Sequence, residues 1–264
     1  MSQSFVKKFA ERFKGSPAIG APPAMIDIHC HLLPGVDDGP KTWETTLEMC
    51  RMAQQDGVRQ IVATPHANHT FPYSREEHEA SLQQLRNQFS GLEFVMGCDF
   101  HCSYENVQDA IQNPQRYSIG DTRYLLLEFN DFASARQMTD TMAVLAGSGF
   151  RCIITHPERM ALAAENGDFA RALVDAGGLV QITANSLTGF WGPRVQKISE
   201  RVLKAGLVSI IASDAHETKR RVPILSEAWR LAAKLVGQEY ANELVAGNAE
   251  AILRNRDVYV DGRQ

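Results

Sequence analysis

Length and composition already narrow what this chain can be. It has 264 residues, of which 44% are hydrophobic and 22% charged, and its formal net charge is −4. This composition excludes a disordered chain and a coiled coil, and the charge gives no reason to expect nucleic-acid binding. The length fits two ordinary domains or one large α/β barrel, a fold of roughly 250 residues.

The sequence carries no signal for membrane insertion or export. Its longest apolar runs have the length of a strand, as in Val208–Ala212, far short of the roughly 20 residues of a transmembrane segment. The N-terminus lacks the apolar core of a secretory signal. The five cysteines are scattered without paired spacing, which favours reduced thiols. We therefore expect a cytoplasmic protein without a transmembrane segment.

Residues 1–23 form a basic extension. Phe5, Phe9 and Phe13 recur at helical spacing among lysines and arginines, which predicts a short amphipathic helix over residues 1–14. The following stretch, rich in proline and glycine, is typical of a linker. The helix can dock on the protein body or fray; the alternative is docking to a membrane surface or a partner. Residues 24–264 show no break in composition, so we expect one catalytic domain there.

From Ala24 onward, short apolar runs alternate with helical patterns. The predicted strands are Met25–Cys30, Gln60–Thr64, Glu93–Cys98, Tyr124–Glu128, Cys152–Thr155, Leu179–Thr183 and Val208–Ala212. The helical stretches include Trp43–Asp56, Ser74–Phe89 and Ala135–Gly147, the second with Ser74 and Glu77 at capping-box spacing. This alternation implies parallel strands joined by crossover helices. The sequence predicts an α/β barrel of about seven units, with an open doubly wound sheet as the alternative.

Histidines and acidic residues collect where the predicted strands end. Six of the seven strands lead into residues able to bind a metal, in the segments Asp27-Ile28-His29-Cys30-His31 with Asp37-Asp38, Thr64-Pro65-His66, Cys98-Asp99-Phe100-His101, Glu128, Thr155-His156 and Ser213-Asp214-Ala215-His216. In a barrel these ends lie on one face, where active sites are built. Packing does not explain such a ring, because isolated buried charges cost too much.

The local spacing supports metal binding. His29 and His31 are two residues apart on a strand and point to one side, so Cys30 points into the core. Asp214 and His216 repeat this spacing. Imidazole and carboxylate without thiolate suit Zn, Mn or Fe. Because a zinc site closes at four ligands, the number of candidates fits two or three ions, with Glu128 as a candidate bridge.

Arginines near these residues indicate phosphate chemistry. Arg159 follows His156 by three residues, and Arg220 and Arg221 follow His216; a guanidinium fork matches phosphate oxygens. We favour Arg159 and Arg221 as phosphate ligands and expect Arg220 to be solvated, with a pairing of Arg159 to Glu158 as the alternative. The chain lacks the C-x5-R spacing of cysteine-dependent phosphatases and the glycine loops of nucleotide sites.

Together these motifs resemble the polymerase and histidinol phosphatase (PHP) family. Within it, the chain is most similar to the metal-dependent protein-tyrosine phosphatases encoded with bacterial capsule and exopolysaccharide genes. The resemblance covers most of residues 25–255. It rests on Met25-Ile26-Asp27-Ile28-His29-Cys30-His31, Val36-Asp37-Asp38-Gly39-Pro40, Ala63-Thr64-Pro65-His66, Thr155-His156-Pro157-Glu158-Arg159 and Ser213-Asp214-Ala215-His216.

The resemblance implies a distorted seven-stranded βα barrel, a (β/α)7 TIM-like barrel, with two or three divalent ions, commonly manganese, and iron or zinc as alternatives. The ligands it implies are His29, His31, Asp38, His66, Asp99, Glu128, His156, Asp214 and His216. Arg159 and Arg221 match arginines that the family uses on the phosphotyrosyl phosphate. Asp99 departs from the pattern, because glutamate is expected there and aspartate has a shorter reach. Residues 1–23 are not part of the family pattern.

The resemblance further implies a phosphoric monoester hydrolase acting on phosphotyrosine. Its substrate would be the tyrosine-rich tail of a bacterial tyrosine autokinase that controls capsule or exopolysaccharide synthesis. Phe71 and Tyr73, in the loop after His66, are candidates to bind the aryl ring, with local packing as the alternative. Two other classes stay open: a small-molecule phosphomonoesterase of the histidinol-phosphatase type, and a domain that holds metal for structure or docking.

Overall fold

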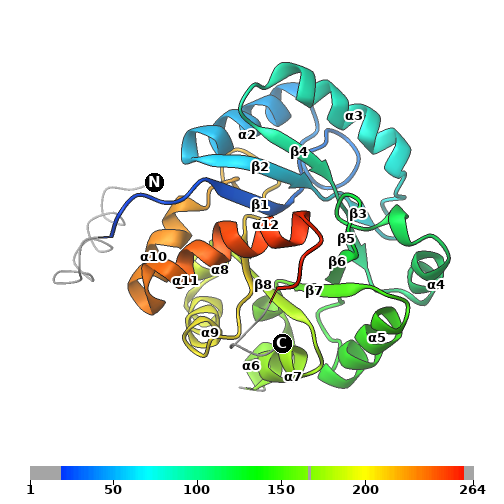
Figure 1. Cartoon of the computed structure of the whole chain (residues 1–264), viewed down its shortest axis with the longest axis vertical. Helices are drawn as coiled ribbons and strands as arrows, with labels where there is room; N and C mark the ends of the chain where they lie inside the picture. Colours follow the sequence, from blue (N-terminus) through cyan, green and yellow to red (C-terminus); the bar gives the residue numbers. More distant parts are fainter. Residues whose placement is uncertain (1–18, 166–167, 259–264) are drawn as a thin grey trace.

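Strands and helices alternate along the chain in the computed structural model, which describes residues 19–165 and 168–258 (Figure 1). The helix predicted over residues 1–14 lies outside the described residues. The strands are β1 (Met25–Cys30), β2 (Val58–Ala63), β3 (His66–Ala67), β4 (Glu93–Met96), β5 (Asp99–His101), β6 (Tyr124–Glu128), β7 (Arg151–Thr155), β8 (Leu179–Thr183) and β9 (Ile210–Ala212).

The helices cover the strands and follow most of them in sequence. The α-helices are α2 (Trp43–Asp56), α3 (Arg75–Gln88), α4 (Tyr104–Gln112), α5 (Ala135–Gly147), α6 (Ala161–Glu165), α7 (Phe169–Asp175), α8 (Ala184–Leu187), α9 (Pro193–Lys204), α10 (Ser226–Val236), α11 (Gln238–Asn242) and α12 (Asn248–Leu253). Two 3-10 helices, η1 (Pro114–Arg116) and η2 (Pro157–Arg159), and a π-helix, η3 (Glu243–Gly247), complete the set in the described ranges. None of the described helices is both long and apolar enough to cross a membrane.

All seven predicted strands are present, with boundary shifts of a few residues. The two short strands β3 and β5 are additional to the prediction. β3 is separate from β2 because Pro65, directly after the predicted strand Gln60–Thr64, lacks the N–H that a continuing ladder needs. The third predicted strand is interrupted at Gly97 and Cys98, where glycine weakens the strand. The predicted helices α2 and α5 have the predicted bounds.

Every strand pair is parallel, and the pairs form two sheets ordered β1-β2-β4 and β3-β5-β6-β7-β8-β9. Backbone hydrogen bonds also join β1 to the segment after β9. The Asp214 N–H donates to the His29 carbonyl (2.8 Å), and the His31 N–H donates to the Ala215 carbonyl (2.9 Å). The carboxyl ends of the first and last strands therefore lie side by side. The predicted parallel α/β fold is confirmed.

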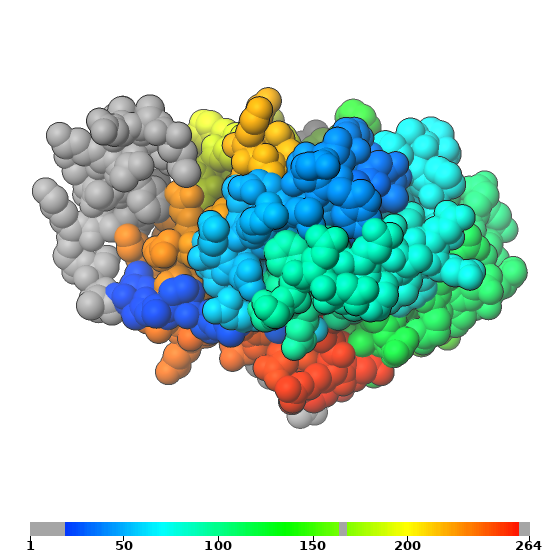
Figure 2. Space-filling view, turned by 90° about the horizontal axis from the view of Figure 1, so that it is seen from above, coloured from blue at the N-terminus to red at the C-terminus, as the bar shows by residue number. Residues whose placement is uncertain are grey.

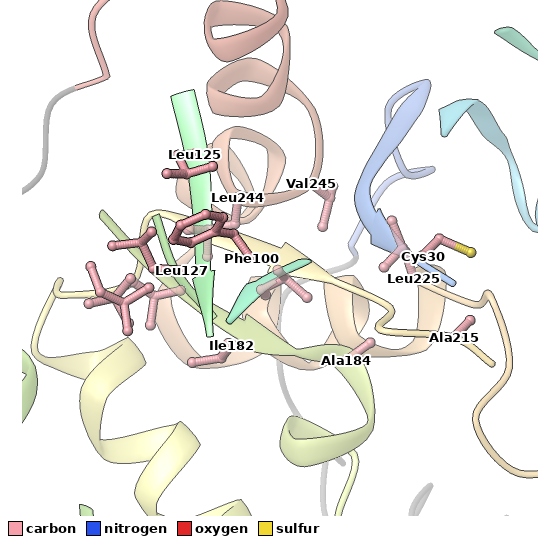
Figure 3. Close-up of a cluster of buried hydrophobic side chains, with 14 of the residues drawn as sticks. Cys30, Phe100, Leu125, Leu127, Ile182, Ala184, Ala215, Leu225, Leu244 and Val245 are labelled. Carbon is pink, nitrogen blue, oxygen red and sulfur yellow. The ribbon is translucent and has the colours of Figure 1, made fainter. Parts of the chain in front are cut away.

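Apolar side chains pack on both faces of the strands, because neighbouring residues of a strand point to opposite faces. In β6, Leu125 and Leu127 belong to an outer cluster beneath the helices, part of which is drawn in Figure 3, while Leu126 belongs to an inner cluster. The inner cluster also takes Ile252 from α12, the helix that lies across the strands in Figure 1. The space between the strands and α12 is therefore filled with apolar side chains.

The end of the predicted linker lies against the C-terminal helices. The Gly20 N–H donates to Oε1 of Gln238 at the start of α11 (3.0 Å), and Ile19 packs on the outer cluster. Figure 2 shows this blue segment next to the orange helices α10 and α11. Residues 19–23 are thus tied to the body of the protein.

Asp56, the last residue of α2, caps a helix that follows much later in the chain. Its Oδ2 accepts hydrogen bonds from the N–H groups of Leu225 (2.7 Å) and Ser226 (2.9 Å), and its Oδ1 accepts from the Ser226 hydroxyl (2.5 Å). These bonds satisfy backbone N–H groups at the start of α10, where the N-cap residue Leu225 has no side chain able to accept them. Gly57 ends α2 with φ 97°, a left-handed value that glycine adopts without strain.

The Asp56 cap leads to a stability prediction. Asp56→Ala is expected to lower the free energy of unfolding by about 1–2 kcal/mol, because two backbone donors lose their acceptor. Urea denaturation followed by circular dichroism measures the change. Glu48→Ala on the same helix is the control; it removes only an exposed pair with Arg51 and should change stability by less than about 0.5 kcal/mol. Equal stability of the two variants would contradict a capping role.

Candidate active site

The nine predicted metal ligands come together at the carboxyl ends of the strands. They form four overlapping groups, and within each group the ligand atoms lie within 4.8 Å of one another. The groups are His31, Asp38, His66, His216; His29, Asp99, His156; His29, His31, Asp214; and His66, Asp99, Glu128. Shared members join the groups into one cluster, beside a cavity of about 190 Å³ that Arg159 and Arg221 also line.

β1 and the residue that follows it supply two of these histidines, His29 and His31, at an irregular point of the ladder. The register of β1 against β2 shifts between Asp27 and Cys30, and such irregularities re-aim side chains beside active sites. The Nε2 atoms of His29 and His31 lie 3.2 Å apart, whereas Cys30 is fully buried in the outer apolar cluster. The prediction that the two histidines share a side opposite Cys30 is confirmed.

Asp37 and Gln181 hold these two imidazole rings. The Asp37 carboxylate accepts a hydrogen bond from Nδ1 of His31, and Gln181 Oε1 accepts one from Nδ1 of His29, both at 2.8 Å. A proton held on Nδ1 leaves the Nε2 lone pair free to bind an ion. The Gly39 N–H also donates to Asp37 (2.8 Å), and a Cβ at Gly39 would come within 2.8 Å of the His31 carbonyl oxygen. Glycine is therefore required at this turn.

Asp99 and Glu128 lie between the histidines contributed by different strands. Oδ2 of Asp99 is 3.4 Å from His29 Nε2 and 3.4 Å from His66 Nδ1. Oε2 of Glu128 is 3.5 Å from His66 Nδ1. Asp99 thus reaches the cluster although glutamate was expected at this position. His101 contacts the cluster through Glu128, with its Nδ1 3.8 Å from Oε2.

Two of the predicted ligands have strained backbone, and two arginines lie beside them. His156 has φ 36° and Asp214 has φ 52°, values that residues other than glycine rarely adopt and that concentrate at functional sites. Arg159 and Arg221 each place a guanidinium nitrogen 2.8 Å from a carboxylate oxygen of Asp214. Arg159 is not paired with Glu158, because the Glu158 carboxylate accepts the Thr183 N–H instead (3.0 Å).

Burial and mutual charge shift the pKa values in the cluster. Burial, helped by His216, lowers the pKa of His31 to about 4. Burial also disfavours the charged form of His29, but the carboxylates of Asp99 and Asp214 outweigh it and raise its pKa to about 9. Against its own burial, Asp214 keeps a pKa well below the ordinary value, because Arg159 and His29 favour the carboxylate. Asp214 is therefore ionised, as a ligand to a cation must be.

The donor set fits divalent metal ions. Asp99 is fully buried, and neither of its carboxylate oxygens has a hydrogen-bond donor among the residues that the structure describes. A buried acceptor without a partner is costly, so it calls for a ligand. The surrounding donors are imidazole nitrogens and carboxylate oxygens without a thiolate, a set that suits Mn, Fe or Zn. Groups of three and four donors are sufficient for more than one ion.

The cysteines are unsuited to act as nucleophiles. All five are free thiols, and burial raises the pKa of each, to about 12 for Cys50 and Cys152 and well above the ordinary value for Cys30, Cys98 and Cys102. A catalytic thiolate needs the opposite shift.

The two aromatic residues predicted to contact a substrate ring occupy different environments. Phe71 stacks beside His66, with ring centroids 6.0 Å apart. Tyr73 is buried, and its hydroxyl donates to the Gly97 carbonyl (3.0 Å) while its ring packs against Tyr117. Tyr73 is therefore a core residue, which corrects the prediction of a substrate contact there. An apolar ring with one satisfied hydroxyl is stable inside the core.

Some residues at the site were missing from the sequence prediction. Gln181 lies 152 positions from His29; the available signal was a lone amide within the otherwise apolar start of β8. Trp191 lies between α8 and α9 and not at the end of a strand, where the prediction looked for site residues. Its ring centroid is nevertheless 5.2 Å from Cζ of Arg159 and 5.9 Å from Cζ of Arg221. Asp131 lines the same cavity as the two arginines. The spacing of neighbouring residues carries no signal for these long-range contacts.

Comparison with known proteins identifies the family. A family model described as capsular polysaccharide synthesis, CpsB/CapC, matches residues 25–254. The chain belongs to the CpsB/CapC family. Tyrosine-protein phosphatase YwqE of Bacillus subtilis is 34% identical over 240 residues, which cover 89% of this chain and 94% of that protein. The putative tyrosine-protein phosphatase CapC of Staphylococcus aureus is 34% identical over 210 residues, which cover 78% of this chain and 82% of that protein.

Solved structures agree with this assignment. The structures of YwqE from Bacillus subtilis and CpsB from Streptococcus pneumoniae, described as unique metal-dependent tyrosine phosphatases, include one with a TM-score of 0.82 at 34% identity, covering 91% of this chain and 98% of that chain. A histidinol phosphate phosphatase from Lactococcus lactis shares the fold alone, with a TM-score of 0.52, 12% identity and coverage of 89% and 95%. The family resemblance predicted from the motifs is confirmed.

The contact between Asp37 and His31 leads to a prediction on metal binding. Asp37→Ala is expected to weaken Mn²⁺ binding about 10–100-fold, because His31 loses the acceptor that orients its ring. Titration calorimetry on metal-free protein measures the affinity, and circular dichroism checks the fold. The exposed Asp140→Ala on α5 serves as the control. Unchanged affinity in folded Asp37→Ala would show that the carboxylate does not position the ligand.

Proposed function

We propose that this chain is a metal-dependent protein-tyrosine phosphatase, a phosphoric monoester hydrolase. The observation that carries the proposal is the convergence of nine metal-competent side chains in one cluster, six of which line a cavity together with Arg159 and Arg221. Family membership supports it, since YwqE and CpsB are described as metal-dependent tyrosine phosphatases. The high pKa of the buried thiols argues against a cysteine mechanism.

We further propose that residues 24–264 form one PHP-type catalytic domain on a distorted (β/α)7 barrel. In this description, β2 with β3 and β4 with β5 each count as one interrupted strand, which leaves seven. The hydrogen bonds from Asp214 to His29 and from His31 to Ala215 support closure between the last strand and the first.

We assign two or three divalent ions to the cluster, manganese first, with iron or zinc as alternatives. The proposed ligands are His29, His31, Asp38, His66, Asp99, Glu128, His156, Asp214 and His216. Bound divalent ions would supply Lewis acidity toward the phosphoryl group and an activated water. The chain itself fixes the ligand geometry, because Asp37 and Gln181 hold the imidazole rings of His31 and His29.

Arg159 and Arg221 are proposed to bind the phosphate. Arg159 comes from η2 and Arg221 from the segment after β9, and their guanidinium groups meet at Asp214. Both can therefore donate to oxygens of one phosphoryl group at the edge of the ligand cluster. Phenolate, with a pKa of about 10, leaves more easily than a serine alkoxide and needs less protonation. Phe71, beside His66, is proposed to contact the aryl ring.

The proposed substrate is the phosphorylated, tyrosine-rich tail of a bacterial tyrosine kinase of capsule or exopolysaccharide synthesis. The family description supports the link to capsular polysaccharide synthesis. A site at the carboxyl ends of the strands can accept an extended, disordered tail without unfolding a partner domain.

The proposal predicts both substrate preference and metal dependence. A phosphotyrosyl peptide should have a higher kcat/KM than the matching phosphoseryl peptide at equal Mn²⁺ loading. Chelation should abolish phosphate release and keep most of the circular dichroism signal, because the large apolar core does not depend on ions; added Mn²⁺ should restore turnover. Full activity of metal-free protein would refute metal dependence. Much faster turnover of histidinol phosphate would favour a small-molecule phosphomonoesterase.

The proposed role of Arg159 and Arg221 leads to a separate prediction. Arg159→Ala and Arg221→Ala should each lower kcat/KM about 10–100-fold with metal content unchanged, because a charge-assisted hydrogen bond is lost. Lysine should restore activity only in part, since it lacks the fork. Arg220→Ala, which alters an exposed guanidinium beside Phe190, is the control and should stay within about twofold. Loss of metal in both variants, measured by elemental analysis, would make these residues structural instead.

A further inference from the structure

A groove between α6 and α9 begins next to the active site. The two helices lie side by side (Figure 1), and the groove has a volume of about 410 Å³. It is lined by Ala163, Pro193, Arg194, Lys197, Ile198 and Arg201. Among the side chains that the structure describes, all the charged members of this lining are cations, and the rest are apolar. We call it the α9 groove.

Both walls of the α9 groove start beside the phosphate-binding arginines. On one wall, Ala163 follows Arg159 by four residues. On the other, Pro193 follows Trp191 by two, and the Trp191 ring lies 5.2 Å from Cζ of Arg159. Trp191 and the residues after Arg159 thus connect the arginines to the two walls of the groove, and the proposal routes the peptide along this side.

The cations of the α9 groove are available for a ligand. Arg194, Lys197 and Arg201 are exposed and spaced three and four residues apart, which places them on one face of α9. Among the residues that the structure describes, Arg194 and Lys197 have no ion-pair partner. The carboxylate of Glu200 on the same helix is 3.7 Å from Lys204. Arg201 donates to the Ala163 carbonyl (3.2 Å) and so connects the two walls.

The dimensions of the groove match a short extended segment. Arg194 and Arg201 are seven residues apart, or about 10 Å along a helix. About three residues of an extended peptide span the same distance. Two or three carboxylates on such a segment can therefore face the three cations.

We propose that the α9 groove binds an acidic peptide segment that flanks the phosphotyrosine of the substrate. The inference rests on the proposed phosphatase function and adds to it a preference among phosphotyrosine sites. Complementary charge on a solvated rim speeds association and is screened by salt. The preference should therefore be strong at low ionic strength and fade as salt is added.

The test uses the full chain loaded with Mn²⁺ and the double variant Arg194→Glu/Lys197→Glu. Three substrates are compared: a phosphotyrosyl peptide with acidic residues on either side, the same peptide with amides in their place, and p-nitrophenyl phosphate. Wild type should favour the acidic peptide over the amide peptide about fivefold in kcat/KM at low salt. The variant should lose or invert this preference, chiefly through KM, and should hydrolyse p-nitrophenyl phosphate within about twofold of wild type.

Arg51→Glu/Arg254→Glu is the matched control, because it makes the same change in net charge on α2 and at the residue that follows α12. It should keep the preference for the acidic peptide. An unchanged preference in the α9 variant, or an equal loss of preference in the control, would refute the proposal that the groove binds the acidic segment. Loss of binding to phosphatidylserine vesicles by the α9 variant, with peptide kinetics unaffected, would assign the groove to a membrane instead and also overturn the proposal.

The two proposals fail in different ways. If wild type releases no phosphate from any phosphotyrosyl peptide, the phosphatase function fails. Fluorescence anisotropy with a non-hydrolysable phosphonate analogue of the acidic peptide then tests the groove alone. Weaker binding of this analogue to the α9 variant than to the control would support the groove, and equal binding would refute it.

Discussion

Nine ionisable side chains crowd together at the carboxyl ends of parallel strands, and all of them except the exposed Asp38 are buried or half-buried. The rest of the site is built around this crowding. Five are histidines and four are carboxylates. Buried charge is costly unless it is paired, hydrogen-bonded or bound to a cation. Asp37, Gln181 and the two arginines at Asp214 each satisfy part of this demand. Divalent ions would satisfy the carboxylate of Asp99, whose oxygens have no donor among the described residues.

The scaffold can hold such a cluster because the polar groups lie at the carboxyl ends of the strands, whereas apolar side chains fill the space beneath α12. The inner apolar cluster includes side chains of the strands and of α12. Stability therefore comes from buried apolar surface and does not depend on the ionisable side chains of the site. Asp27 links the two halves of the site: it accepts hydrogen bonds from the N–H (3.0 Å) and the hydroxyl (2.5 Å) of Ser213. The neighbouring residues His29 and Asp214 are thereby fixed relative to each other, although 185 positions separate them in the chain.

The proposed recognition of phosphate and of peptide would depend on different kinds of contact. The proposed phosphate site is compact, because the guanidinium groups of Arg159 and Arg221 both lie 2.8 Å from carboxylate oxygens of Asp214. The α9 groove is solvated, and its cations act by charge over a longer range. Trp191 lies between the two, with its ring beside both arginines. This arrangement separates the chemical step from the choice of substrate.

The strands, the parallel α/β fold and the gathering of histidines and carboxylates at the strand ends could be predicted from the sequence, because hydrophobic alternation and the spacing of His29, His31, Asp214 and His216 are local properties of the chain. The set of nine ligands came from the resemblance of the motifs to a known family. Spacing alone did not separate Asp37, which accepts a hydrogen bond from His31, from the neighbouring Asp38, which belongs to the cluster; only the resemblance did. Nor did it show that Tyr73 is buried or that Gln181, Trp191 and the cations of α9 adjoin the site. Those outcomes depend on packing between segments far apart in sequence, and that packing is decided only when the whole chain has folded.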